Sequence, residues 1–267
     1  MTRLPINIHR WLALAAGFVL TSSTQYLSAE DWPQWRGANR DAVWNDSGVV
    51  DRFPDDGLTV KWSMPVRGGF AGPAVADGRV FVLDYQETPG SRTMDGNERL
   101  VVFDEETGAL LWQQKWPATY RNLQFKFATG PRAVPTVDEN RVYTLGAAGM
   151  LSCFDTETGD LLWRVDTVTD YDSTIPVQGT SQAPIVEGNL LVAAVGGEPD
   201  AKVVAFDKVT GDEVWRSMDN ISETGYSAPI VIDAGGVRQL ILWHATAITS
   251  LNPETGEIYW NQDFTIG

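Results

Sequence analysis

Cysteine and histidine are almost absent from this sequence of 267 residues. Cys153 is the single cysteine, which excludes an intramolecular disulfide and a cysteine-based zinc cluster. The histidines are His9 and His244, and the sequence contains no Ser/His/Asp set, phosphate-binding loop or dinucleotide fingerprint. We therefore predict no catalytic residue and no metal site, with Cys153 serving as a small buried apolar residue.

Basic residues are also scarce. The chain has 20 Lys and Arg against 35 Asp and Glu, a formal net charge of -15. Such a protein repels both the phosphate backbone of nucleic acids and anionic lipid headgroups. A nucleic-acid partner is therefore not expected.

The sequence lacks a hydrophobic run long enough to serve as a stable membrane span, since the apolar stretch at residues 11–20 is too short. This stretch follows Arg3 and Arg10 and leads, through polar residues, to Ala29, which is the pattern of a secretory signal peptide. We expect residues 1–29 to be cleaved and the protein to be exported, periplasmic or extracellular, with no integral membrane segment left. An uncleaved anchor is the alternative. No cysteine follows the stretch, so a lipoprotein is not expected.

A four-fold internal repeat is the main feature that is present. Each copy has Asp or Asn, a Thr-Gly pair and, four residues after the glycine, a tryptophan. The glycines are separated by 51, 52 and 45 residues. The repeated residues are Asp104, Gly108, Trp112, Asp155, Gly159, Trp163, Asp207, Gly211, Trp215, Asn252, Gly256 and Trp260.

Each part of the repeat has a physical role. The Asp or Asn side chain can accept backbone N–H bonds, and glycine supplies the positive φ that closes a short hairpin. Paired apolar residues after each turn predict outer strands covered on both faces. With two short strands upstream, each repeat becomes four antiparallel strands, the size of a propeller blade. We predict an all-β propeller with blades at about 70–115, 132–166, 182–217 and 226–263.

The Asp-x-x-Thr-Gly-x-x-x-Trp pattern resembles the tryptophan docking motif of the pyrroloquinoline-quinone-like (PQQ-like) propellers. Segments 31–37 and 130–132 resemble exported propeller proteins of planctomycete-type bacteria. The resemblance implies that each repeat tryptophan packs between adjacent blades while its indole N–H finds a backbone partner. It also implies a ring of seven or eight blades.

A further tryptophan, Trp62, lies 50 residues before Trp112 in a segment with strand character. We expect residues 58–65 to be a closing strand, so that residues 58–267 form an arc of four blades plus this strand, truncated from a larger ring. A complete four-bladed propeller, with Trp62 only anchoring a loop, is the alternative. We expect residues 30–57 to form a clasp across the outside of the ring.

Candidate ligand-facing residues lie in the loops that lead from one blade to the next. Aromatic, arginine and hydroxyl side chains on such loops suit a sugar, a peptide or a cofactor. They are Arg121, Phe127, Arg132, Thr180, Gln182 and Tyr226.

The sequence is thus interpreted as an exported, non-catalytic binding or scaffold module for a protein, glycan or small ligand, with no cofactor. One alternative, drawn from the resemblance, is a fragment of a PQQ-dependent dehydrogenase, in which PQQ and calcium would be bound. A second alternative is an accessory propeller in outer-membrane protein assembly.

Overall fold

The computed structural model describes residues 30–47, 49–124, 129–219 and 222–264. The predicted signal peptide, residues 1–29, and the candidate Phe127 lie outside these ranges.

The described chain forms four separate antiparallel sheets, each of four strands that are consecutive in sequence. Blade 1 contains β1–β4, blade 2 β5–β8, blade 3 β9–β12 and blade 4 β13–β16. This confirms the predicted all-β chain of four propeller blades. One short helix, α1 (Thr167–Tyr171), follows blade 2. The strands are β1 (Ala74–Ala76), β2 (Arg79–Glu87), β3 (Asp95–Asp104), β4 (Leu110–Thr119), β5 (Thr136–Asp138), β6 (Arg141–Leu145), β7 (Met150–Asp155), β8 (Leu161–Asp166), β9 (Ile185–Glu187), β10 (Leu190–Gly197), β11 (Ala201–Asp207), β12 (Glu213–Ser217), β13 (Ile230–Ala234), β14 (Val237–Trp243), β15 (Ala247–Leu251) and β16 (Ile258–Asp263).

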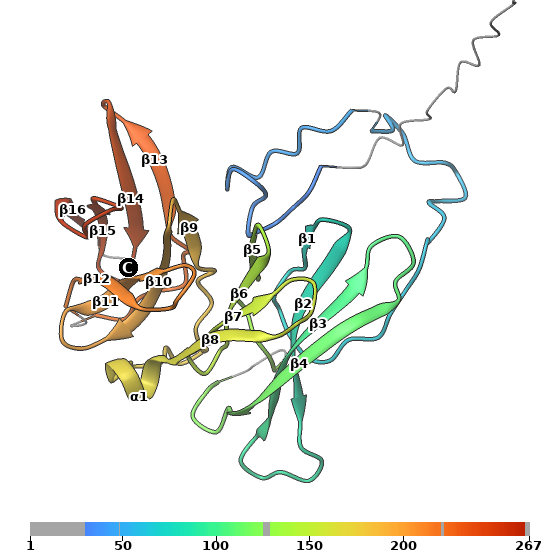
Figure 1. Ribbon diagram of the computed structural model, residues 1–267, viewed down its shortest axis with the longest axis horizontal. Helices are drawn as coiled ribbons and strands as arrows, with labels where there is room; N and C mark the ends of the chain where they lie inside the picture. The colour runs from blue at the N-terminus through green and yellow to red at the C-terminus, as the bar shows by residue number, and fades with distance from the viewer. Residues whose placement is uncertain (1–29, 48, 125–128, 220–221, 265–267) are drawn as a thin grey trace, which may run out of the picture.

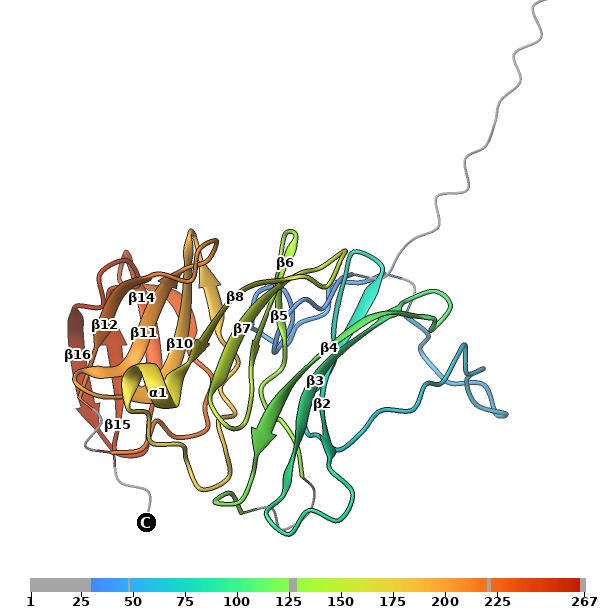
Figure 2. The same ribbon diagram turned by 60° about the horizontal axis from the view of Figure 1, so that its bottom comes forward.

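The blades stand side by side in chain order, from blade 1 in green to blade 4 in red (Figure 2). The first strands of blades 1, 2 and 3 contact one another, so they form the inner edge of an arc (Figure 1). The last strand of each sheet lies at the opposite, outer edge.

The hydrophobic core lies between the blades. In β10, Leu191 and Ala193 pack in the cluster shared with blade 2, whereas Val192 and Ala194 pack in the cluster shared with blade 4. Successive residues of a strand point to opposite faces, so a middle strand between two blades must be apolar at every position. Cys153 belongs to the first of these clusters and is 0% exposed, and burial raises the pKa of its thiol to about 12.

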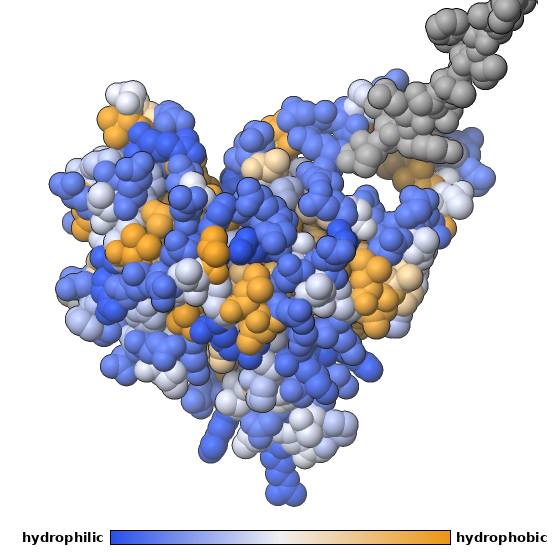
Figure 3. Space-filling view, in the orientation of Figure 1, coloured by the Kyte–Doolittle hydropathy of each residue, from blue (hydrophilic) through white to orange (hydrophobic). Residues whose placement is uncertain are grey.

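The outer strands depart from the sequence prediction. They were expected to be covered on both faces, yet Leu110, Leu161 and Val214 are 50%, 46% and 52% exposed. The reason is position, because each outer strand has no further strand beyond it and only some of its side chains reach the neighbouring blade. Hydrophobic surface therefore appears as separate patches and not as one continuous area (Figure 3).

Three of the four repeated tryptophans, Trp112, Trp163 and Trp215, contact the turn of the next blade. Trp112 Nε1 donates to the Thr156 carbonyl of blade 2 at 3.0 Å. The indole ring packs on Gly159, where an added Cβ would lie only 2.7 Å from the nearest ring atom. Trp163 donates in the same way to Lys208 O of blade 3 at 3.2 Å, and a Cβ on Gly211 would lie 2.6 Å from its ring. Trp215 donates to Pro253 O of blade 4 at 3.2 Å, and a Cβ on Gly256 would lie 2.5 Å from its ring.

Trp62 makes the same contact with blade 1, although segment 58–65 is not a strand. Its Nε1 donates to Glu105 O at 2.8 Å, and a Cβ on Gly108 would lie 2.6 Å from the ring. Residues 58–67 pair with no strand of the described chain. The structure therefore has the Trp62 contact of the expected closing strand without the strand itself.

The segment expected to clasp the outside of the ring begins instead at the inner edge. Trp32 pairs through its backbone with Val75 of β1, and Pro33 accepts a bond from Val137 N of β5. Arg40 is 5% exposed and donates to backbone carbonyls immediately before β9 and β13. Residues 32–40 thus contact the inner edge of all four blades, because strand starts present carbonyls that a guanidinium can satisfy. Arg40 bonds to Ala183 O (3.4 Å), Pro184 O and Pro229 O (2.8 Å).

A matched pair of glycine substitutions isolates the docking contact. Gly211 and Gly188 both have positive φ, 79° and 57°, but only at Gly211 does a tryptophan ring occupy the space of a Cβ. Gly188→Ala should lower the free energy of unfolding by about 1 to 2 kcal/mol through backbone strain alone. Gly211→Ala should lower it by about 1 to 3 kcal/mol more, because the methyl group displaces Trp163. Urea unfolding measures both, and equal losses would contradict the role given to the ring.

We call residues 32–40 the inner clasp, and replacing the buried Arg40 tests its contribution to stability. Arg40→Met removes the donor from several buried carbonyls and should destabilise the protein by about 2 kcal/mol or more. Arg52→Met is the control, since the Arg52 side chain is 84% exposed and its loss should cost less than about 0.5 kcal/mol. Thermal unfolding of the two variants compares them directly, and similar midpoints would show that Arg40 does not hold the blades together.

Candidate functional site

The blade-connecting loops do not gather the candidate residues into one site. Thr180 and Gln182 are 3% and 1% exposed. Thr180 Oγ1 donates to Gly146 O, and Gln182 Nε2 donates to Thr224 O at 2.9 Å and Ser227 O at 3.0 Å. These two side chains, expected to face a ligand, are enclosed and hold loops together instead, because the buried carbonyls of the loops require donors.

The other described candidates lie in three different pockets. Exposed Arg121 lines one of about 400 Å³ together with Leu123 and Ile175. Tyr226 is 44% exposed and lines another of about 350 Å³ beside Trp243. Arg132 lines the third, which lies at the inner edge of the blades.

Two aromatic residues at the end of β4, Trp116 within the strand and Tyr120 directly after it, are structural. Trp116 and Tyr120 are 1% and 0% exposed and donate to the buried carboxylate of Glu98, at 2.9 and 2.6 Å. Glu98 also accepts from Ala147 N of blade 2 at 2.7 Å. Burial raises the pKa of Glu98 while these donors lower it, and the net direction is upward. The end of β4 is therefore fixed at the boundary between blades 1 and 2.

The pocket around Arg132 has the composition of a ligand site. It has a volume of about 540 Å³ and lies between the inner clasp and the first strands of blades 1 and 2. Its lining contains three aromatic side chains and two arginines and no carboxylate. The lining residues are Trp32, Trp35, Arg36, Phe70, Gly72, Pro73, Val75, Arg132 and Val134. We call it the inner pocket.

Its cations are positioned by aromatic rings. The Arg132 guanidinium carbon lies 4.4 Å from the centre of the Phe70 ring, and Arg132 Nε donates to Gln178 O at 3.0 Å. The Arg36 guanidinium carbon lies 5.4 Å from the Trp35 ring. Arg36 Nη2 also donates to the Asp41 carbonyl at 3.2 Å. A guanidinium stacked on a ring in this way keeps its positive charge. The inner pocket can thus offer flat apolar surfaces and positive charge to the same ligand.

Sequence reasoning identified only Arg132 of this group. Trp32 and Trp35 were assigned to a clasp, and Phe70 was not singled out. They come from separate segments that meet only because Trp32 pairs with Val75. The unusual density of tryptophan in residues 30–44 was the available signal.

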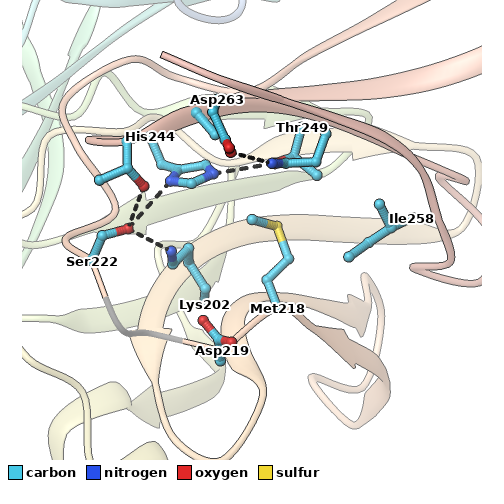
Figure 4. Close-up of a pocket in the computed structure, with 11 residues that line it drawn as sticks. Lys202, Met218, Asp219, Ser222, His244, Thr249, Ile258 and Asp263 are labelled. Atoms are coloured by element: carbon cyan, nitrogen blue, oxygen red, sulfur yellow. Dashed lines mark hydrogen bonds between the residues drawn. The ribbon is translucent and has the colours of Figure 1, made fainter. Parts of the chain in front are cut away.

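A second pocket of about 450 Å³ lies between blades 3 and 4 (Figure 4). Lys202 Nζ donates to Ser222 Oγ at 3.0 Å, and His244 Nδ1 lies 3.4 Å from the same oxygen. Thr249 Oγ1 donates to Asn261 at 2.6 Å, so it accepts from His244 Nε2 at 3.1 Å. His244 Nδ1 is then the acceptor that faces Ser222. His244 is packed, at 6% exposed.

The electrostatics of this second pocket do not favour proton transfer by His244. Burial, with Lys202 nearby, lowers the pKa of His244 to about 4, against raising contributions from Asp219 and Asp263. Burial also lowers the pKa of Lys202. A histidine this weakly basic is a poor proton acceptor at neutral pH. The cluster is best described as a polar network that closes the boundary between the two blades.

Within the described ranges, no group of three or more His, Cys, Asp or Glu side chains could hold a metal ion. No helix found there is long and apolar enough to span a membrane.

Comparison with known proteins places residues 96–265 in the family described as outer membrane protein assembly factor BamB, of the PQQ-like repeat type. The chain is 29% identical over 141 residues to quinoprotein alcohol dehydrogenase PedH of Pseudomonas putida. This alignment covers 49% of this chain and 22% of that protein. It is 21% identical over 264 residues to the outer membrane protein assembly factor BamB of Shewanella oneidensis, covering 80% and 62%. The chain therefore spans less than two thirds of the length of these relatives.

Among solved structures, a europium-containing methanol dehydrogenase matches with a TM-score of 0.54 at 16% identity, covering 79% of this chain and 46% of that one. A quinohemoprotein alcohol dehydrogenase from Pseudomonas putida matches with a TM-score of 0.51 at 19% identity, covering 76% and 35%. At these identities the matches support the propeller fold alone.

The charge state of His244 can be measured directly. Nitrogen-15 NMR of the imidazole should show titration near pH 4, because the buried ring is neutral at higher pH. Between the ordinary histidine pKa of 6.5 and this value, only the unfolded chain takes up the proton, so this group lowers stability as the pH falls through that window. Lys202→Met should raise the pKa of His244 by removing a nearby positive charge. Titration of His244 near 6.5 in the folded protein would contradict the assignment.

Proposed function

Because the chain belongs to the PQQ-like β-propeller family, we propose that it is an exported, non-catalytic propeller that binds ligands in the inner pocket. The ligand class proposed is a sugar ring that bears an acidic group. Fold alone does not assign this role, so the proposal rests on the chemistry of the site.

The composition of the inner pocket carries the proposal. Sugar rings present C–H faces that pack on indole and phenyl rings, and Trp32, Trp35 and Phe70 supply such surfaces. Arg36 and Arg132 suit a carboxylate or sulfate, and no acidic side chain lines the pocket. In a chain with a net charge of -15, this local excess of positive charge distinguishes the pocket from the average surface.

Under the dehydrogenase alternative, PQQ and calcium would be bound. Among the described residues no cluster of three potential acidic, His or Cys ligands exists. We derive no chemical step through PQQ or calcium for this chain.

A protein partner is the second candidate. It is favoured by the family description and by the Shewanella oneidensis relative, whose name is that of an outer membrane protein assembly factor. Under this proposal the exposed loop residues Arg121 and Tyr226 would contact the partner.

Calorimetry with defined oligosaccharides tests the first proposal. Oligomers of glucuronate should bind with saturation, and the neutral oligomers of glucose should bind at least about tenfold more weakly, because they lack the group that pairs with the arginines. Arg132→Gln should weaken glucuronate binding while leaving the binding of glucose oligomers almost unchanged. Trp35→Ala should weaken both, because it removes a stacking surface.

Trp44→Ala is the matched control, since Trp44 is 51% exposed and does not line the pocket. It should bind glucuronate as the parent protein does. If neither kind of sugar binds, or if Arg132→Gln has no effect, the proposed ligand class is wrong and the protein-partner candidate is favoured.

A further inference from the structure

Lys202 is a buried cation without an ionic partner. It is 2% exposed and lies near the start of β11, in the second pocket between blades 3 and 4 (Figure 4). Its Nζ donates to Ser222 Oγ, and it takes part in none of the ion pairs found within the described part of the chain. Asp219 and Glu198 favour its charged form, yet burial lowers its pKa overall. An ammonium has three N–H donors, so two remain for an acceptor outside the described residues.

The polar groups next to Lys202 are already bonded to one another. Ser222 Oγ accepts from Lys202 Nζ at 3.0 Å and from Thr246 Oγ1 at 3.1 Å, which uses both lone pairs of the hydroxyl. Its own hydrogen is left for His244 Nδ1, at 3.4 Å. The other imidazole nitrogen, Nε2, is bonded to Thr249 Oγ1 at 3.1 Å. This network therefore leaves the remaining donors of Lys202 to solvent or to a ligand.

The second pocket is formed by the facing sides of blades 3 and 4. Leu242 and Leu251 of blade 4 pack in the cluster shared with blade 3. His244 and Thr249 lie two positions from these leucines, so they point to the same side. Thr249 is the strand partner of Asn261, which places Asn261 of β16 on that side too. The pocket is thus built between two adjacent blades and uses none of the opposite face of blade 4.

Carboxylates also line this pocket. Exposed Asp263 accepts from Asn261 Nδ2 at 2.9 Å through Oδ1, and its Oδ2 bonds no described residue. Asp219 is a second acidic lining residue. Both carboxylates act electrostatically on the same His244 ring as Lys202. The carboxylates repel a purely anionic ligand and Lys202 repels a purely cationic one, so a ligand that carries both charges fits best.

Two apolar side chains flank these charges. Met218 packs against the cluster shared by blades 3 and 4, and Ile258 is 48% exposed in the pocket lining. The volume of about 450 Å³ is within the usual range for small-molecule sites, about 300 to 1,000 Å³. An aliphatic side chain therefore suits the space beside the charged groups.

We propose that the second pocket binds an aliphatic α-amino acid, with its carboxylate on Lys202 and its ammonium toward Asp263. The ligand carboxylate supplies the acceptors that Lys202 lacks, and the charge-assisted hydrogen bonds formed there are stronger than neutral ones. The aliphatic side chain lies against Met218 and Ile258. The site is separate from the inner pocket and does not rest on the function proposed for that pocket.

Calorimetry of the full chain with L-leucine and two analogues tests the charge pairing. L-leucinamide lacks the carboxylate and N-acetyl-L-leucine lacks the ammonium, while both keep the side chain. L-leucine should bind with saturation. Each analogue should bind at least about tenfold more weakly, because one charged contact is lost.

Substitutions assign each charge of the ligand to its residue. Lys202→Met should bind L-leucine and L-leucinamide alike, and Asp263→Asn should bind L-leucine and N-acetyl-L-leucine alike. Lys61→Met is the control, since the Lys61 side chain is 57% exposed and does not line the pocket, and it should bind as the parent does. Lys202→Met should still bind glucuronate as the parent does, so a failure at this site is distinguishable from a failure at the inner pocket.

Nitrogen-15 NMR of His244 locates the ligand without any substitution. L-leucine should shift the imidazole resonances and raise the pKa of His244, because a carboxylate beside Lys202 offsets the positive charge near the ring. L-leucinamide brings no carboxylate and should not raise this pKa.

The proposal is overturned if L-leucine gives no saturable heat, or if it binds without any change at His244. It is also overturned if Lys202→Met keeps the preference of the parent for L-leucine over L-leucinamide, since the carboxylate is then bound elsewhere. The NMR result uses the parent chain, so it stands even if a variant folds poorly.

Discussion

The structure depends on one repeated contact, in which an indole ring lies on a glycine that cannot carry a side chain. The glycine has positive φ because it closes the turn between the third and fourth strands of its blade, and the missing Cβ leaves room for the ring. The indole N–H is satisfied by a carbonyl of the same turn, so a large side chain is buried without an unpaired donor. A single local sequence pattern therefore both forms a hairpin and joins it to the preceding blade.

The inner edge of the blades is held by a different interaction, the hydrogen bonds of the segment at residues 32–40. Here the first strands are short, only three residues in β1, β5 and β9, and cannot hold the blades together by themselves. Residues 32–40 run along this edge and bond to all four blades, ending in the buried guanidinium of Arg40. The inner pocket lies beside this segment, with Trp32, Trp35 and Arg36 of the segment in its lining. Stability at the inner edge and the candidate site thus have the same origin.

The relationship to quinoprotein dehydrogenases and to assembly factors leaves function to be argued from the site. What this chain shares with those relatives is the blade repeat. The inner pocket instead involves residues 32–36, which precede the matched region 96–265. Arg36 and the three aromatic rings of the pocket lie before the matched region, whereas Arg132 lies within it.

The sequence by itself determined the blades, because the Asp or Asn and Thr-Gly pattern forms each turn through residues a few positions apart and recurs, with its tryptophan, four times. It did not determine which face of a strand is covered, as exposed Leu110 and Leu161 show, since that depends on whether another layer lies outside the strand. It placed Thr180 and Gln182 on ligand-facing loops, whereas the tertiary structure encloses them as donors to distant carbonyls. Arg40, Glu98 and the inner pocket were decided only by tertiary structure, because each brings together residues from different blades or segments, up to 189 positions apart, and no local pattern encodes such distances.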